Sequence, residues 1–314
     1  MARTRRNLLL GLDAFGTLFT PKKSIAVQYA DVARSYGLGG IVENDLDRCF
    51  RKAFQKHSNR FPNYGKRSGM NATKWWANVI TSTFQCLPSW NEKSPPPELV
   101  EAILHRFSSS EGYQLFPDVL PFFKMLRNRA SEDTSTVWPW NQTVVGIISN
   151  SDDRIIGVLK SFGLTVASLR GTPNLEKSRT NSEGSSDISF MALSYDVGAE
   201  KPSRSIFNTA ERLAFETIHD LEAGAGADSS LSDWDKVYVG DDINKDVVGA
   251  LNSGWKAALI QRDLTDEGTT NDRKAMRLMD WSDLGIQPDG PIASRKVPLL
   301  NDLRGISRMQ ILRD

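Results

Sequence analysis

The sequence predicts an α/β protein: an open parallel sheet, with a helical domain inserted after the first strand. Short apolar runs alternate with helix-patterned segments along most of the chain, whereas the block 20–110 holds helical patterns alone. Alternating strands and helices imply right-handed crossovers and therefore a parallel sheet. The length of 314 residues allows about two domains.

The first strand is an apolar run at 7–13 that ends on Asp13. The inserted block then carries apolar residues at i, i+3 and i+4 spacing, which is typical of helices. The expected helices are Ser24–Tyr36, Val42–His57, Ala72–Phe84 and Pro97–Phe107. A further helix at Asp118–Arg129 follows Pro117. These segments divide the chain into a sheet domain and a helical insert.

Strands and helices then alternate to about residue 260. The expected strands are Thr143–Ile148, Ser189–Leu193, Lys236–Val239 and Trp255–Ile260. The helices between them are Asp152–Gly163, Ser203–Ala214 and Asn244–Ser253. Polar, aperiodic stretches at 170–188 and 220–233 predict flexible loops. We expect a core at 1–19 and 112–262, a cap at 20–111, and an extension at 263–314 that packs on the core as a short helix and an irregular strap.

Composition narrows the function classes. Thirty-nine basic and thirty-eight acidic side chains leave no net field to attract nucleic acid or an anionic membrane. No apolar run approaches the roughly 18 residues that a membrane helix needs. Cys49 and Cys86 imply no disulfide, which favours a reducing compartment. We expect a cytoplasmic protein, and nothing in the sequence argues against a nuclear pool; the oligomeric state is not indicated.

Four polar residues stand where a strand stops or a helix begins. They are Asp13, Ser149, Lys201 and Asp241. Because ligands of open α/β sheets bind at the carboxyl ends of the strands, the four residues are expected to face one crevice. Each has an ordinary reading when taken singly, such as a turn residue, a helix cap or a solvated lysine. Their joint placement at one edge of the sheet favours a functional site.

The chemistry of this set is coherent. Asp13 suits a nucleophile that carries a covalent ester, and Ser149 suits a hydrogen-bond donor to the bound group. Lys201 would keep Asp13 ionised and attract anions. Asp13, Asp241 and a backbone carbonyl of the first turn would supply the hard oxygen ligands that Mg²⁺ prefers.

These residues resemble the haloacid dehalogenase (HAD) superfamily of aspartate-nucleophile hydrolases, whose four motifs match LDAFGTL, IISNSD, the lysine of AEKPSRSIF, and VGDDINKD. The resemblance implies a Rossmann-like core and a helical C1-type cap. Within the cap, FPNYG and KWWANVITSTF resemble one eukaryotic branch of the superfamily. The resemblance assigns catalysis to Asp13, Ser149 and Lys201, and magnesium binding to Asp13, Asp241 and the Phe15 carbonyl. We also expect substrate binding by Thr17 and Asn150, with Asp242 and Asp246 in supporting positions around the metal or Lys201.

The chain departs from the family pattern at Phe15, where most members have a second aspartate as general acid/base. Losing such a group typically costs about 10²–10⁴-fold in rate. Three hypotheses follow: a hydrolase of a small phosphorylated or anionic metabolite with another acid/base, a weakly active or inactive binding protein, and a 2-haloacid dehalogenase. Cap residues Glu43, Asp47 and His57 are candidate replacements, whereas Trp75 and Trp76 are expected to be buried packing residues.

Overall fold

The computed structural model describes residues 6–90, 93–128, 138–167, 186–222, 231, 234–262, 276–284 and 296–312. The chain forms two compact units. One comprises Met1–Phe19, Leu115–Asn150 and Leu164–Asp314, and the other comprises Thr20–Gln114 and Ser151–Gly163. We call them the sheet unit and the helical unit.

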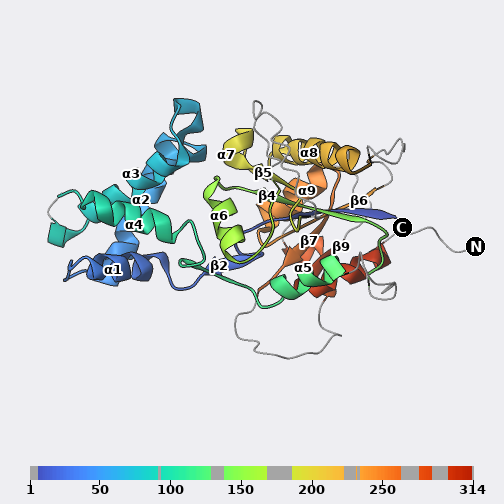
Figure 1. The fold of residues 1–314 in the computed structure, drawn as a ribbon, viewed down its shortest axis with the longest axis horizontal. Coiled ribbons are helices and arrows are strands. Elements are labelled where there is room, and N and C mark those ends of the chain that lie inside the picture. Colours follow the sequence, from blue (N-terminus) through green and yellow to red (C-terminus); the bar gives the residue numbers. More distant parts are fainter. Residues whose placement is uncertain are drawn as a thin grey trace, which may run out of the picture. The chain divides into compact units, whose positions relative to one another are not determined.

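A seven-stranded sheet in the order β5-β4-β1-β6-β7-β9-β8 forms the sheet unit (Figure 1). Its strands are β1 (Asn7–Leu12), β4 (Thr143–Ser149), β5 (Phe190–Leu193), β6 (Trp234–Gly240), β7 (Lys256–Ile260), β8 (Met276–Asp280) and β9 (Lys296–Leu300). Every neighbouring pair is parallel except β8 with β9. The predicted α/β fold with a parallel sheet is therefore confirmed.

The first strand lies between β4 and β6, and its apolar run explains this central place. Leu8, Leu9, Leu10 and Leu12 have no exposed surface. A strand covered on both faces reads as a continuous apolar run, because both of its faces pack against other layers. Leu12 is aligned with Ile147 of β4 and Val239 of β6, so the three strands end at the same edge of the sheet.

Helices cover both faces of this sheet. Helix α8 (Arg204–Glu222) packs on β4 and β5, and α5 (Val119–Asn128) contacts η7 (Leu303–Leu312). Figure 1 shows α8 on one side of the sheet and α5 on the other. The shorter helical segments of this unit are α7 (Ser194–Val197), η4 (Ile243–Val248), α9 (Gly249–Asn252) and η6 (Trp281–Leu284).

The C-terminal segment differs from its expectation as a short helix and an irregular strap. It contributes β8 and β9 to the sheet, and β9 pairs with β7 through Leu259–Leu299 and Ile260–Leu300. The sequence pattern did not predict β9, because KVPLL is short and contains a proline. A proline argues against a strand inside a sheet, since it has no N–H to donate to a neighbouring strand.

The helical unit contains α1 (Ile25–Ser35), α2 (Glu43–Arg60), η1 (Asn63–Ser68), α3 (Ala72–Gln85), η2 (Pro88–Trp90), α4 (Pro97–Arg106) and α6 (Arg154–Ser161). Side chains of Ser24 and Asn71 cap the N-termini of α1 and α3. Strands β2 (Phe19–Pro21) and β3 (Tyr113–Leu115) form a separate two-stranded sheet. No described helix has both the length and the apolar character that a membrane crossing requires.

Cys49 and Cys86 form a disulfide, so the expectation of unpaired cysteines was wrong. Cys49 lies on α2 and Cys86 follows α3, and packing of these helices sets the two Cα atoms 5.6 Å apart. That separation is common for disulfides. Because the two cysteines are 37 positions apart in the sequence, their proximity depends on tertiary packing. Most of the loops expected at 170–188 and 220–233 lies outside the described residues.

Candidate active site

Three adjacent strands deliver the candidate residues to one edge of the sheet. Asp13 directly follows β1, Ser149 ends β4, and Asp241 directly follows β6. The Asp13 amide donates to the Val239 carbonyl at 2.9 Å, which extends the β1–β6 ladder to the site. Both Asp13 and Ser149 are buried, with 8% and 2% of their surface exposed.

A tight turn follows Asp13 and brings Asp241 against it. The Leu18 amide donates to the Ala14 carbonyl at 2.8 Å, and Gly16 has a φ of +72°. A Cβ atom at Gly16 would collide with the Asp241 carboxylate. Glycine is therefore required here both for the left-handed backbone and for the close approach of Asp241.

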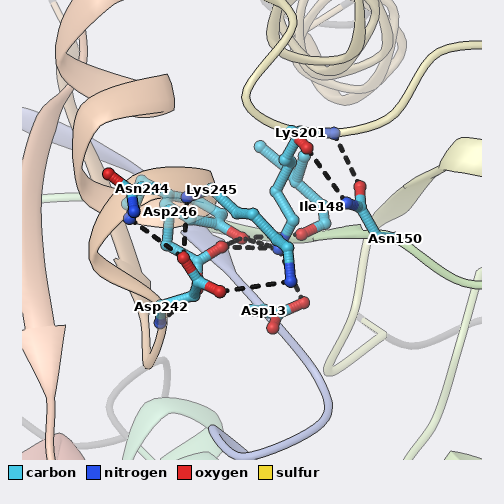
Figure 2. A network of polar contacts seen from close by, with 9 residues as sticks. Asp13, Ile148, Asn150, Lys201, Asp242, Asn244, Lys245 and Asp246 are labelled. Carbon is cyan, nitrogen blue, oxygen red and sulfur yellow. Dashed lines mark hydrogen bonds and ion pairs between the residues drawn. The ribbon is translucent and has the colours of Figure 1, made fainter.

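Lys201 is the cation of the site, and its side chain is only 2% exposed. Its Nζ atom donates to Asp246 Oδ1 at 2.6 Å and to Tyr238 Oη at 2.8 Å, and forms an ion pair with Asp13 Oδ1 at 2.9 Å. Figure 2 shows this side chain between the two carboxylates. Burial opposes its charge, but Asp13 and Asp246 outweigh burial and raise the pKa of the ammonium.

Asn150 holds the backbone of Lys201. Its Oδ1 accepts from the Lys201 amide at 2.6 Å, and its Nδ2 donates to the Lys201 carbonyl at 3.1 Å (Figure 2). The Lys201–Pro202 peptide bond is cis. We expected Asn150 to bind substrate. In the structure its side-chain amide binds the backbone of Lys201 instead. Asn150, the residue after β4, thus links the end of this strand to the backbone of Lys201.

Three carboxylates meet beside Lys201. Ligand atoms of Asp13, Asp241 and Asp246 all lie within 4.8 Å of one another. Burial and the charges of Asp13 and Asp246 raise the pKa of Asp241 to about 6. Burial and Asp13 also raise the pKa of Asp246, although Lys201 opposes them. A divalent cation would relieve this repulsion and would find the oxygen ligands that Mg²⁺ prefers, so the residues fit the metal that the family pattern implies.

The two supporting aspartates have different surroundings. Asp246 is 1% exposed; its Oδ1 accepts from Lys201 and its Oδ2 accepts from the Asp242 amide at 2.9 Å. Asp242 caps η4, because its Oδ1 accepts from the amides of Asn244 and Lys245 at 2.9 Å each. These backbone hydrogen bonds and Lys245 outweigh partial burial and lower the pKa of Asp242. Asp246 therefore supports Lys201, and Asp242 supports the helix start.

Phe15 and Thr17 lie in the turn after Asp13. The Phe15 ring packs edge to face on Phe19, with ring centroids 4.8 Å apart. Thr17 is fully buried, and its hydroxyl has no hydrogen-bond partner among the described residues. Its carbonyl accepts from Arg262, which also pairs with Asp118 at 2.6 Å. The substrate-binding role expected for Thr17 remains a prediction.

The candidate cap acids have partners within the helical unit. Glu43 pairs with Arg34 at 2.9 Å, Asp47 pairs with Arg51, and His57 Nε2 lies 2.9 Å from Ser82 Oγ. Burial, Lys56 and Arg60 lower the pKa of His57. As expected, Trp75 is a buried packing residue with 2% exposure, whereas Trp76 is half-buried and donates to Asp152 at 2.9 Å.

Sequence reasoning missed Tyr238 and Arg262. Tyr238 lies inside β6 between two valines, where an aromatic residue ordinarily indicates core packing. Arg262 follows the last predicted strand and reads as a surface residue. Neither position carries a local pattern that would distinguish it, since both depend on partners far away in the chain.

Comparisons with known proteins support a common family. The HAD-hydrolase-like family model matches residues 199–280. An uncharacterized hydrolase of Schizosaccharomyces pombe is 30% identical over 249 residues, or 79% of this chain and 88% of that protein. Haloacid dehalogenase-like hydrolase domain-containing protein 3 of Danio rerio is 26% identical, over 80% and 83% of the two chains. The L-2-haloacid dehalogenase PA0810 shares the fold, with a TM-score of 0.55, 15% identity, and coverage of 98% and 99%.

Proposed function

The chain belongs to the HAD-like hydrolases, and we propose that it is a magnesium-dependent phosphatase-type enzyme that acts on a small phosphorylated metabolite through Asp13. One observation carries this proposal. Asp13, Asp241 and Asp246 gather around a single buried lysine, Lys201. Such an excess of carboxylates suits a site that binds a cation and, with it, a phosphate group.

Asp13 is the nucleophile in this proposal. Its carboxylate lies 2.9 Å from the Lys201 ammonium, which orients it. A carboxylate oxygen attacks the phosphorus, the bond to the leaving oxygen breaks, and a phosphoaspartate remains for water to hydrolyse. Ser149, at the end of the neighbouring strand, would donate to a phosphoryl oxygen.

Asp13, Asp241 and the Phe15 carbonyl would hold Mg²⁺. When bound, the ion would screen the charge of the phosphate from the attacking carboxylate. Asp246 would keep Lys201 in place, because its Oδ1 is already bonded to the ammonium at 2.6 Å. We further propose that 20–111 is a C1-type cap and that 263–314 is an extension of the core.

The carboxylate cluster argues against one of the alternatives. A 2-haloacid dehalogenase would have to bind an anionic substrate next to three carboxylates with Lys201 as counter-charge and no metal ion, which like-charge repulsion opposes. A binding protein with weak or no catalysis would retain the same phosphate and cation site. The phosphatase proposal and the binding proposal therefore differ in turnover, not in what the site binds.

Phosphate release from a panel of phosphorylated metabolites tests the proposal. We expect magnesium-dependent release from at least one compound, abolished by Asp13→Asn. Asp302→Asn is a matched control, since Asp302 pairs with its near neighbour Arg304 at 2.6 Å. That variant is expected to keep wild-type activity.

Two results would redirect the proposal. Inactivity over the whole panel, with magnesium binding intact by calorimetry, would support the binding protein. Metal-independent halide release from 2-haloacids would support the dehalogenase.

A further inference from the structure

The position two residues after Asp13, where the family pattern has an acid/base aspartate, carries a hydrocarbon side chain. Phe15 occupies it, and its ring packs on Phe19 at a centroid distance of 4.8 Å. An attack on an alkyl phosphate expels an alkoxide, which needs a proton as it leaves. The question is whether another group next to Asp13 in the sheet unit supplies that proton.

Lys201 has its hydrogens committed. An ammonium has three N–H donors. Two are donated to Asp246 at 2.6 Å and Tyr238 at 2.8 Å, and Nζ also forms an ion pair with Asp13 Oδ1 at 2.9 Å. A proton transferred from Lys201 would leave Asp13 and Asp246 without their counter-charge.

Tyr238 is fully buried, and its hydroxyl group is already hydrogen-bonded within the protein. Its oxygen accepts from Lys201, and its single proton has two acceptors in reach, the Ile148 carbonyl at 2.7 Å and Asp246 Oδ1 at 3.2 Å. The ring fits because Gly11 has no side chain: a Cβ atom there would lie 2.8 Å from Tyr238 Cδ2. Tyr238 thus ties Lys201 to the end of β4, one residue before Ser149.

The aspartates do not replace the missing donor. Both oxygens of Asp246 accept hydrogen bonds, from Lys201 and from the Asp242 amide. Asp241 is the proposed ligand of the metal, and as a ligand it carries no proton. Lys201, Tyr238, Asp241 and Asp246 are therefore not arranged to protonate a leaving group.

We propose that this site acts on phosphoryl donors whose leaving group departs as a stable anion, chiefly acyl phosphates, and that the phosphoryl group then accumulates on Asp13. This inference rests on the proposed function and names its substrate class. Such a donor needs no proton at the moment of cleavage, so the loss of the acid at Phe15 does not slow the first step.

The first step balances without acid catalysis. An Asp13 oxygen forms a bond to phosphorus, the bond between phosphorus and the acyl oxygen breaks, and the electron pair leaves with the carboxylate. In the second step water attacks phosphorus, the bond to Asp13 breaks, and the pair returns to the Asp13 carboxylate. The water proton must pass to solvent, because no base stands at Phe15. The second step is therefore slowed by about 10²–10⁴-fold, which produces a burst.

Acetyl phosphate and ethyl phosphate form a matched pair of probes with good and poor leaving groups. With acetyl phosphate and magnesium, we expect a burst of one acetate per chain and a phosphorylated Asp13, detected by intact mass and by its release with hydroxylamine. Phe15→Asp is expected to raise the ethyl phosphate rate by about 10²–10⁴-fold and to remove the burst. Phe15→Asn introduces a side chain of the same shape as aspartate but without a carboxylic acid. It is expected neither to raise the ethyl phosphate rate nor to remove the burst.

Failure of this inference differs from failure of the proposed function. Wild-type turnover of ethyl phosphate within tenfold of acetyl phosphate, with no phosphorylated Asp13, would overturn the inference and leave the phosphatase proposal standing. No labelling and no turnover with any donor would overturn both. If Phe15→Asp does not fold, p-nitrophenyl and phenyl phosphate on the wild type serve instead. A shallow dependence on the leaving group would then overturn the inference.

Discussion

Two charge networks of the described residues, one in the helical unit around Asp152 and one in the sheet unit around Lys201, differ in how they are balanced. In the helical unit, Asp152 accepts from Arg154 Nε at 2.8 Å, from Arg154 Nη2 at 2.9 Å and from Trp76 at 2.9 Å. The Arg154 guanidinium also stacks on the Trp76 ring at 4.4 Å. In the sheet unit, one ammonium on Lys201 faces Asp13 and Asp246, with Asp241 close by.

The pKa directions reflect this difference. Burial opposes the charge of Asp152, yet Arg154 and Trp76 outweigh burial and hold the pKa of that carboxyl below its usual range. In the sheet unit, burial and neighbouring carboxylates raise the pKa of Asp241 and of Asp246. One network is neutral and has its hydrogen bonds satisfied, which suits a structural role. The other holds excess negative charge, which suits the binding of a cation.

Removing the only cation that binds Asp13 and Asp246 in the described network should have the largest effect. Lys201→Met leaves buried carboxylates without a counter-charge, and we expect it to lower the free energy of unfolding by about 3–5 kcal/mol at pH 8. The pKa of Asp246 is raised in the folded protein, so as the pH falls this carboxylate is protonated in the folded state before it is protonated in the unfolded state. Protonation removes the unpaired charge, and the loss of unfolding free energy should therefore shrink toward pH 5. Urea unfolding across this range measures it.

Lys236→Met is the matched control. Lys236 pairs with Glu211 at 2.7 Å near the surface, with both side chains about a quarter exposed. This variant should cost at most about 1 kcal/mol. Equal losses for the two lysines would contradict the view that the sheet-unit network depends on one cation.

Breaking the balanced network should have a smaller effect that does not depend on pH. Asp152→Asn removes the counter-charge of Arg154, and we expect a loss of about 1.5–3 kcal/mol by urea unfolding. Since the folded pKa of Asp152 lies below its ordinary value of 3.8, this stability is present above pH 3.8 and is lost only as pH falls further. The loss should therefore be constant from pH 5 to 8.

Asp45→Asn tests the same substitution at an exposed pair of the helical unit. Asp45 pairs with Arg48, whose side chain is 72% exposed, and removal should cost at most about 1 kcal/mol. A loss for Asp152→Asn that grows between pH 5 and 8 would show that the two networks do not differ as described.

The smallest expected effect is a gain in stability. Without metal at pH 7, Asp241 is charged in the folded state although its pKa there is about 6, so it destabilises the fold relative to an unfolded pKa of 3.8. Asp241→Asn should raise Tm by about 2–4 °C at pH 7 in a chelator, and the gain should disappear toward pH 4.

Magnesium should raise the Tm of the wild type more at pH 7 than at pH 5, and should leave Asp241→Asn unchanged. Asp31→Asn is a control of opposite sign, because a hydrogen bond from Lys23 lowers the pKa of Asp31. A magnesium response that persists in Asp241→Asn would remove Asp241 from the proposed metal site.

Much of the fold could be predicted because its signals are local. The apolar runs of β1, β4, β6 and β7 and the helical periodicity of α1 to α4 are properties of short segments, and each was found within a few residues of its bounds. The positions of Asp13, Ser149 and Asp241 follow from the same signals, since each stands where a run ends. Strand β9 was missed because KVPLL becomes a strand only by pairing with β7.

By itself, the sequence determined the parallel α/β fold, the helical insert, and the edge of the sheet where Asp13, Ser149 and Asp241 lie. Only the tertiary structure decided what these residues touch: Tyr238 joins Lys201 to Ile148, Asn150 holds the Lys201 backbone, and Cys49 reaches Cys86. The spacing of apolar residues indicates which face of a helix or strand is buried, because the residues of one face recur with the period of that element. Partners are chosen by packing between distant segments, which no local pattern encodes.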